Sequence, residues 1–282
     1  MATVIVPAHN EANVIRRCLD SLKGQAGLET LVVACNGCTD NTAEIVLNEY
    51  PQAICLDICR PSKVNALNAA EKHITSWPVF YIDADTRLSA NAIQDITSAL
   101  ADGKTLLAAP EPVIDTSRSS WAVKQFYHIW LRLPYIKEGV VATCSYVVSE
   151  EGHKRFTHFP DIINDDGFVR CQFDPCERRN IPGTKVFISA PHNLASLIKI
   201  KTRARLGNMQ LESAGLCTHK ERKLYSRSLR DRFLSREFVP TFVYFLITIF
   251  THFRAAWQYR SLKTYKWEKD HSSRQSGLPP DT

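Results

Sequence analysis

The chain has 282 residues, 44% of them hydrophobic and 23% charged, so it can bury a complete core and has the composition of an ordinary globular protein. Its nine cysteines, an odd number scattered among apolar neighbours, argue against a disulfide framework and favour reduced, packed thiols. The net charge of +6 is uneven, because residues 220–236 alone hold seven Lys/Arg and two Asp/Glu.

Five apolar runs of strand length recur along the first part of the chain, at residues 3–7, 28–34, 53–58, 79–83 and 105–110. Helical patterns separate them. This alternation predicts an α/β fold with a doubly wound, mostly parallel sheet flanked by helices.

Two of the intervening helical patterns have clear apolar faces, formed by Ile15, Cys18, Leu19 and Leu22 and by Ile93, Ile96 and Leu100. Between them, Asn41 with Glu44 three residues later predicts a capping box before a second helix. Ser89 is the expected cap of the helix that carries Ile93.

Polar segments follow four of the predicted strands. They are residues 7–11 (PAHNE), 36–40 (NGCTD), 60–63 (RPSK) and 83–85 (DAD). In open parallel sheets, ligands bind outside the carboxyl ends of the strands. Four polar loops on one rim therefore predict a binding site there.

Two acidic pairs are the candidates for chemistry on this rim. Asp83 and Asp85 point the same way along a strand and suit a hard divalent cation, with a solvated turn as the alternative. Asp165 and Asp166 precede Gly167, which is typical of a turn, but a carboxylate brought near a leaving group would instead act as a general base.

A second possible metal or redox group involves four cysteines, Cys35, Cys38, Cys55 and Cys59. Their spacing roughly imitates a zinc site, and the first two imitate a redox pair. Cys55 and Cys59 lie in a strand-like run, where residues four apart are roughly 13 Å from each other and do not share one ion. Packing thiols are the expected role.

Five segments in order resemble the family-2 glycosyltransferases with the GT-A fold, over roughly residues 3–210. They are VIVPAHNEANVIRRCLDSL, VVACNGCTDNTAEI with SKVNALNAA, YIDADTRLS, FPDIINDDGFVR and RARLGN. The resemblance implies a hexosyltransferase-type enzyme that takes a sugar from a nucleotide-diphosphate sugar, uses Mg2+ or Mn2+, and inverts the anomeric centre in one displacement.

The resemblance also implies roles for individual residues. Donor or nucleotide binding falls to Pro7, His9, Asn10, Glu11, Asn36, Asp40, Lys63, Asn68 and Asp83, with Arg203 and Arg205 as weaker candidates for the pyrophosphate. Asp85, with Asp83, is the expected metal ligand. Asp166 takes the place of the catalytic base, with Asp165 beside it.

Two departures from the family pattern affect specificity. Cys35 and Asn36 stand where many relatives carry two aspartates, so an acidic contact to the nucleotide base is missing. The Gln-x-x-Arg-Trp element of processive synthases is also absent, which favours addition of a single sugar over polymerisation.

We expect four regions in the chain. Residues 1–110 form the donor-binding half and residues 111–219 the acceptor and catalytic half of one GT-A domain. Residues 220–270 form a basic and apolar helical tail, and residues 271–282 a disordered C-terminus.

The tail contains a stretch without Asp, Glu, Lys or Arg at residues 238–253, which as a helix would span roughly 24 Å, short of the ~30 Å hydrocarbon core. With the basic run before it, residues 220–253 are expected to bind the membrane surface, the alternative being that the helix packs on the catalytic domain. Because the apolar helix adjoins the basic run, a lipid partner is favoured over nucleic acid.

The expected partners are a nucleotide-diphosphate sugar and a lipid-linked or cell-envelope glycan acceptor. Residues 1–11 lack the features of a secretion signal, so we expect a cytoplasmic protein on the inner face of the cell membrane. Two other functions stay open: a sugar-phosphate nucleotidyltransferase, for which a Gly-rich loop after the first strand is missing, and a non-catalytic nucleotide-binding, membrane-docking module.

Overall fold

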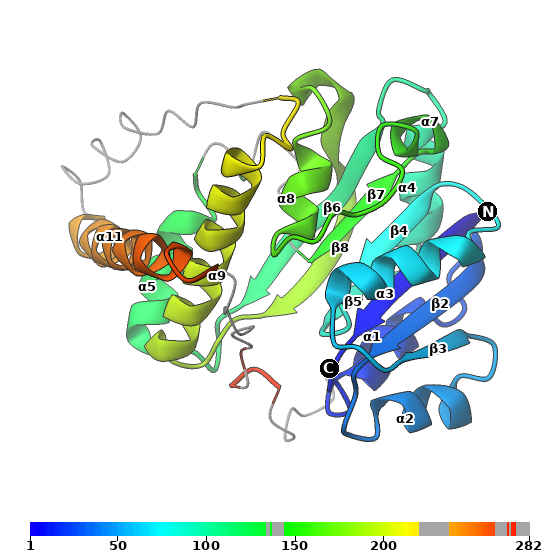
Figure 1. Ribbon diagram of the computed structural model, residues 1–282, viewed down its shortest axis with the longest axis horizontal. Coiled ribbons are helices and arrows are strands. Elements are labelled where there is room, and N and C mark those ends of the chain that lie inside the picture. The colour runs from blue at the N-terminus through cyan, green and yellow to red at the C-terminus, as the bar shows by residue number, and fades with distance from the viewer. Residues whose placement is uncertain (134–135, 137–143, 220–236, 263–269, 271, 275–282) are drawn as a thin grey trace.

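The computed structural model describes residues 1–133, 136, 144–219, 237–262, 270 and 272–274. An eight-stranded sheet forms the centre, and helices α5, α9 and α11 lie together at one end of the molecule (Figure 1). The strand order is β3-β2-β1-β4-β7-β6-β8-β5. The strands are β1 (Ala2–Ala8), β2 (Leu28–Asn36), β3 (Ile54–Ile58), β4 (Val79–Ile82), β5 (Thr86–Leu88), β6 (Leu107–Asp115), β7 (Ser145–Val148) and β8 (Arg178–Ser189).

The predicted α/β sheet is confirmed, and each of the five expected runs overlaps a strand: β1, β2, β3, β4 and β6. The first four pair in parallel. The fifth does not neighbour β4, because β7 pairs antiparallel with both and separates them. The expected boundary at residue 110 falls inside β6, so the two halves share one sheet.

The helices are α1 (Ile15–Leu22), α2 (Thr42–Glu49), α3 (Lys63–Ala70), α4 (Ala92–Leu100), α5 (Trp121–Trp130), α7 (Glu150–His153), α8 (Asp165–Arg170), α9 (Leu194–Ser213) and α11 (Phe238–Tyr259), with short 3-10 turns at Glu71–His73 and Pro175–Glu177. The apolar faces predicted for α1 and α4 are buried.

Asn41 stands at the N-cap position of α2 as predicted but makes no capping hydrogen bond, and the predicted cap at Ser89 is wrong. Ser89 Oγ accepts a hydrogen bond from Lys185 N at 2.9 Å, and Asn91, at φ 61°, precedes α4 instead. The Ser89 side chain therefore makes a hydrogen bond to strand β8 in place of the predicted capping bond to the start of α4.

The core is divided between the two faces of the sheet. Successive residues of β1 alternate, since Val4 and Val6 pack on one side and Ile5 packs on the other. A strand that is buried on both faces must be apolar throughout. This explains the unbroken run at the start of the chain.

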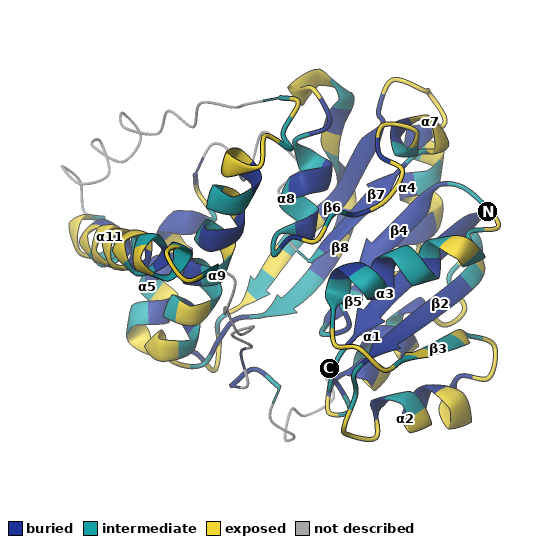
Figure 2. Cartoon of the chain, viewed as in Figure 1, coloured by how far each residue is buried: buried dark blue, intermediate teal, exposed yellow. Residues whose placement is uncertain are grey.

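A third apolar cluster joins α5, α9 and α11. The rings of Phe126 and Tyr244 stack at 5.1 Å between centroids, and Arg205 Nε donates to Thr251 Oγ1 at 3.0 Å. The polar stripe of α11 faces inward, because Thr241, Tyr244 and Thr251 are buried. Most of its large apolar residues are exposed, as the yellow colouring of α11 in Figure 2 shows, whereas Ile247 is buried in the cluster.

Two expectations about the chain ends and cysteines need correction. Cys171 and Cys217, 46 residues apart, form a disulfide, whereas Cys35, Cys38, Cys55 and Cys59 are free. Residues 272–274 were expected to be disordered, but Ser272 and Ser273 are buried. Composition predicts neither the disulfide nor the buried serines, because each depends on contacts between segments that are distant in the sequence. The basic run 220–236, residue 271 and residues 275–282 lie outside the described residues.

Candidate active site

The loops after β1 and β2 are bonded to each other on the rim of the sheet. Asn10, at φ 52°, accepts a hydrogen bond from Thr39 N at 2.7 Å through Oδ1. Asp40 Oδ2 accepts from Ala12 N at 3.1 Å, and His9 Nδ1 lies 2.6 Å from Asn36 O. These polar residues therefore form one bonded wall on the rim of the sheet, outside the lining of the pocket described below.

Asn36 ties this wall to the third loop. Its Nδ2 donates to Ala8 O at 2.8 Å, and its Oδ1 accepts from Ser62 N at 3.1 Å. The adjacent Gly37 has φ +56°, and an added Cβ would lie only 2.7 Å from Pro61 Cβ. Glycine is required there because both the backbone angle and the space exclude a side chain.

Lys63 connects the two halves of the protein. It opens α3, whose cap Ser62 accepts from Asn65 N at 3.2 Å. Its Nζ lies 2.9 Å from Asp83 Oδ1 and 3.1 Å from Asp165 Oδ1. Burial alone would lower the pKa of Lys63, but Asp165 and Asp83 outweigh it and raise the pKa. The lysine is therefore charged at all physiological pH values.

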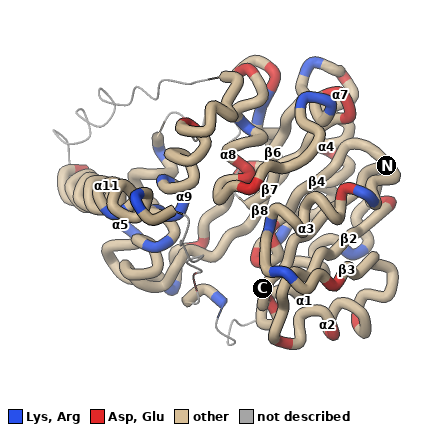
Figure 3. The backbone as a smooth tube through the Cα atoms, viewed as in Figure 1, with Lys and Arg blue, Asp and Glu red and all other residues tan. Residues whose placement is uncertain are grey.

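Asp83 of the strand-end pair and both acids of α8 meet at one pocket. Its lining residues are Pro7, Lys63, Leu67, Tyr81, Ile82, Asp83, Cys144, Tyr146, Asp165 and Asp166. Asp165 Oδ2 and the Tyr146 hydroxyl are buried and have no hydrogen-bond partner among the described residues. Figure 3 shows the acidic start of α8 beside β7. Because buried polar atoms normally have partners, these two are suited to a bound polar ligand.

Asp166 has the properties of a base that works near neutral pH. Burial raises its pKa from 3.8 to about 7, and the negative charge of Asp165 adds to the rise. Lys63 and a hydrogen bond of 2.7 Å from Gly167 N to Asp166 Oδ1 act in the opposite direction. A carboxylate with this pKa accepts and releases a proton readily at pH 7.

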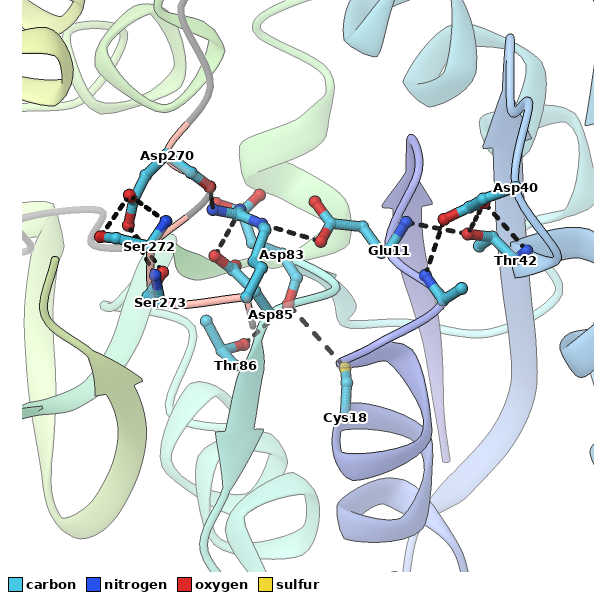
Figure 4. A network of polar contacts seen from close by, with 12 residues as sticks. Glu11, Cys18, Asp40, Thr42, Asp83, Asp85, Thr86, Asp270, Ser272 and Ser273 are labelled. Carbon is cyan, nitrogen blue, oxygen red and sulfur yellow. Dashed lines mark hydrogen bonds and ion pairs between the residues drawn. The ribbon is translucent and has the colours of Figure 1, made fainter. Parts of the chain in front are cut away.

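Asp85 lies in a second polar network next to this pocket (Figure 4). Its Oδ2 is 2.5 Å from Arg274 Nη2, and Arg274 Nε is 2.8 Å from Glu11 Oε2. Two strand-end carboxylates and Glu11 thus face lysine or arginine groups. The carboxylates of this site therefore attract positively charged groups.

Three predicted donor-site residues are directed elsewhere. Both polar atoms of the Asn68 amide bond the backbone of Phe159, at 2.9 and 2.8 Å. Arg205 bonds Thr251 of α11. Arg203, like Arg205, does not line the pocket.

The residues present fit a divalent cation that is shared with a phosphate ligand. Among the described residues, no three His, Cys, Asp or Glu side chains converge on one point, so the protein alone forms no closed metal cage. Mg2+ is commonly held by one or two carboxylates together with substrate phosphates. Asp83 and Asp85, each already paired with a cationic side chain, match that ligand set.

Residues 3–156 match the family model described as glycosyl transferase family 2, which covers more than half of the chain. The chain belongs to glycosyltransferase family 2. A chondroitin synthase and a hyaluronan synthase of Pasteurella multocida are each 30% identical over 110 residues. That match covers 38% of this glycosyltransferase and only 11% of either synthase.

Solved structures share the fold of this glycosyltransferase. A mannosyltransferase from Pyrobaculum calidifontis, in complex with GDP-Man and Mn2+, aligns with a TM-score of 0.61 at 21% identity, over 94% of this chain and 81% of that one. Glucosyl-3-phosphoglycerate synthase from Mycobacterium tuberculosis, in complex with Mn2+, UDP and glucosyl-3-phosphoglycerate, aligns with a TM-score of 0.52 at 18% identity. The alignment covers 78% of this chain and 81% of that one. TarS residues 1–349 from S. aureus, in complex with UDP, align with a TM-score of 0.53 at 12% identity. The alignment covers 96% of this chain and 94% of that one.

Six residues of this glycosyltransferase site were not predicted from the sequence: Leu67, Tyr81, Ile82, Cys144 and Tyr146 in the pocket lining and Arg274 in the adjacent network. Cys144, at φ 63°, and Tyr146 flank the start of β7, and their strand alternation was the only available signal. Arg274 stands 189 residues from Asp85 and carried no local signal at all.

Proposed function

We propose that this chain is a metal-dependent, inverting glycosyltransferase of the hexosyltransferase type, which moves one sugar from a nucleotide-diphosphate sugar to an acceptor hydroxyl. One observation carries the proposal: Lys63 pairs with both Asp83 and Asp165, so the strand-end acid and the α8 acids face one pocket. A donor and an acceptor bound there would meet between a cation-binding acid and a base.

On the donor side, Asp85 and Asp83 would hold Mg2+ or Mn2+. The cation would offset the negative charge that develops on the departing diphosphate. The Mn2+ complexes of two enzymes with the same fold support this choice. Pro7 and the bonded loops that contain His9, Asn10 and Asn36 would form the floor and wall of the nucleotide site.

On the acceptor side, Asp166 would act as the base. It takes the proton of the acceptor hydroxyl while that oxygen bonds to the anomeric carbon, and the bond from that carbon to the diphosphate breaks. The electron pair of that bond leaves with the diphosphate. One displacement with the base opposite the leaving group inverts the anomeric centre. Asp165 would hold Lys63 in place and leave its free oxygen for a substrate hydroxyl.

The acceptor proposal rests on α11. Among the described residues, this is the one helix long and apolar enough to cross a membrane, with 22 residues and a mean hydropathy of 1.4 over 18 consecutive residues. At roughly 33 Å it is longer than the sequence suggested, so length no longer excludes a spanning role. Its packing on α5 and α9 instead favours a position along the membrane surface.

The face of α11 turned away from the protein is apolar and aromatic. Its exposed members are Phe238, Val239, Phe242, Phe245, Leu246, Ile249, Phe250, Phe253 and Trp257. Phe253 and Trp257 are about as exposed as any large apolar side chain in the described chain, at 71% and 70%. An exposed apolar helix face is typical of a lipid-binding surface. A lipid-linked or cell-envelope acceptor would lie within reach there.

We further propose attachment to the inner, cytoplasmic face of the cell membrane. The basic run 220–236 supports an anionic leaflet as the partner. The Cys171–Cys217 disulfide counts against a reducing compartment, where such bonds are rare. The number of free thiols in protein isolated from its native cells decides whether the compartment is reducing. Nine free thiols place the protein in a reducing compartment, and seven free thiols refute that location.

A thermal-shift panel of UDP-, GDP- and dTDP-sugars, with and without Mn2+, tests the donor class. We expect one nucleotide series to stabilise the protein only with metal present. In the responding series, Asp166→Asn should abolish transfer and leave donor binding largely unchanged. Near-normal turnover in that variant would remove Asp166 from the role. Binding without any turnover in the unmodified protein would favour the non-catalytic module.

A further inference from the structure

The C-terminal segment places a guanidinium group inside the proposed metal and donor site. Arg274 Nη2 contacts Asp85 Oδ2, and Arg274 Nε contacts Glu11 Oε2. The three side chains are only 19%, 22% and 8% exposed, respectively. Burial alone would lower the pKa of Arg274, but Asp85 and Glu11 raise it. A single buried positive charge therefore balances two carboxylates.

This segment has its own anchor, so the placement of Arg274 does not depend on the two carboxylates alone. Asp270, 3% exposed, accepts hydrogen bonds from Ser272 N at 2.8 Å and from the hydroxyls of Ser272 and Ser273, both at 2.7 Å. Arg274 Nη1 donates to Asp270 O at 2.7 Å. His192 N, in the loop before α9, donates to Ser272 Oγ at 2.9 Å.

We propose that Asp270 together with residues 272–274 forms an internal plug of the donor site, in which the Arg274 guanidinium takes the place of the divalent cation at Asp85. The inference rests on the proposed metal-dependent function. Arg274 holds Asp85 Oδ2, and a cation at the same carboxylate would lie next to the positive guanidinium, which would repel it. The plug and the cation are therefore mutually exclusive, and a metal-bound donor enters only when the plug leaves.

The physical reason for such a plug is the free-energy cost of two carboxylates that lack a positive partner in a partly buried site. Glu11 and Asp85 would repel each other and resist burial without a positive charge between them. A built-in arginine stabilises the empty site. It also reduces the apparent affinity for the cation, because only the fraction of molecules with an open site binds it.

The plug is tested by Mn2+ binding to the full chain without donor, measured from the electron paramagnetic resonance signal of free Mn2+. Arg274→Gln should bind Mn2+ about tenfold tighter or more than the unmodified protein, since hydrogen bonds to charged groups are lost with the plug. Arg260→Gln, an exposed arginine at the end of α11, is the control and should bind as the unmodified protein does. Equal or weaker Mn2+ binding by Arg274→Gln overturns the plug.

A second variant leaves the arginine in place. Replacing Ser272 and Ser273 by alanine removes the hydroxyl bonds to Asp270 and should tighten Mn2+ binding in the same direction, by a smaller factor. No change in this variant refutes the anchored segment as the plug. Circular dichroism establishes that each variant is folded.

Asp85→Asn separates failure of the plug from failure of the proposed metal site. If Asp85→Asn weakens Mn2+ binding and Arg274→Gln leaves it unchanged, the metal site stands and the plug falls. If no variant binds Mn2+ even with UDP or GDP present, the proposed metal site fails, and hydrogen exchange of the peptide containing residues 270–274 decides whether this segment leaves the site when a nucleotide binds. Faster exchange with UDP or GDP then supports displacement of the segment, and unchanged exchange overturns it.

Discussion

Replacing the proposed base should make this protein more stable as well as inactive. Asp166 has a pKa of about 7 in the folded protein, raised from 3.8, because burial and Asp165 disfavour its charge. The folded state therefore binds an extra proton between roughly pH 4 and pH 7, and stability falls as pH rises through that window. Above pH 7 the full cost of the ionised carboxylate is present.

The magnitude follows from the same values. A rise from 3.8 to about 7 corresponds to at most roughly 4 kcal/mol, at about 1.4 kcal/mol for each pKa unit. Because Lys63 and Asp165 readjust when the charge is removed, we expect Asp166→Asn to gain about 2–4 kcal/mol at pH 8. The Asn amide oxygen retains the acceptor for Gly167 N, so no backbone bond is lost.

Urea unfolding at pH 4 and pH 8 measures the effect. The variant and the unmodified protein should differ little at pH 4 and diverge as pH rises. Asp161→Asn, an exposed carboxylate in the same segment, is the matched control and should show no such divergence. An Asp166→Asn variant less stable than the unmodified protein at pH 8 would refute the burial of a costly charge there.

Three further predictions follow from the site and the surface. Lys63→Met should lower the free energy of unfolding in urea at pH 7 by about 3 kcal/mol, because it leaves the buried Asp165 unpaired. It should also move the acid limb of the pH–activity profile to higher pH, because Lys63 lowers the pKa of Asp166. An unmoved limb contradicts this role of Lys63. Gly37→Ala should cost about 2 kcal/mol or more and weaken nucleotide binding, whereas Gly103→Ala, at φ +68° with nothing within 4 Å of the added Cβ, should cost about 1 kcal/mol. A change of Phe250 and Phe253 to Glu should abolish flotation with anionic vesicles at low salt while leaving turnover of a soluble acceptor unchanged, and continued flotation would remove α11 as the docking surface.

The sequence predicted the parts of the site that follow from local pattern. The apolar run of β1 and the polar loops after the first strands signalled a doubly wound sheet with a ligand rim, because strand periodicity and turn chemistry are set within a few residues. The acid pairs at Asp83 and Asp165 were identified as candidates because cation binding and general-base catalysis both use carboxylates, and the family resemblance implied their roles.

Only the tertiary structure decided how these parts combine. The antiparallel insertion of β7, the sharing of Lys63 by Asp83 and Asp165, and the entry of Arg274 between Asp85 and Glu11 all join residues far apart in the chain. The side chains in these contacts are individually ordinary, but the carboxylates that Lys63 and Arg274 meet raise the pKa of each. Since burial and charge proximity arise only when the segments meet, no local pattern in a single sequence records them.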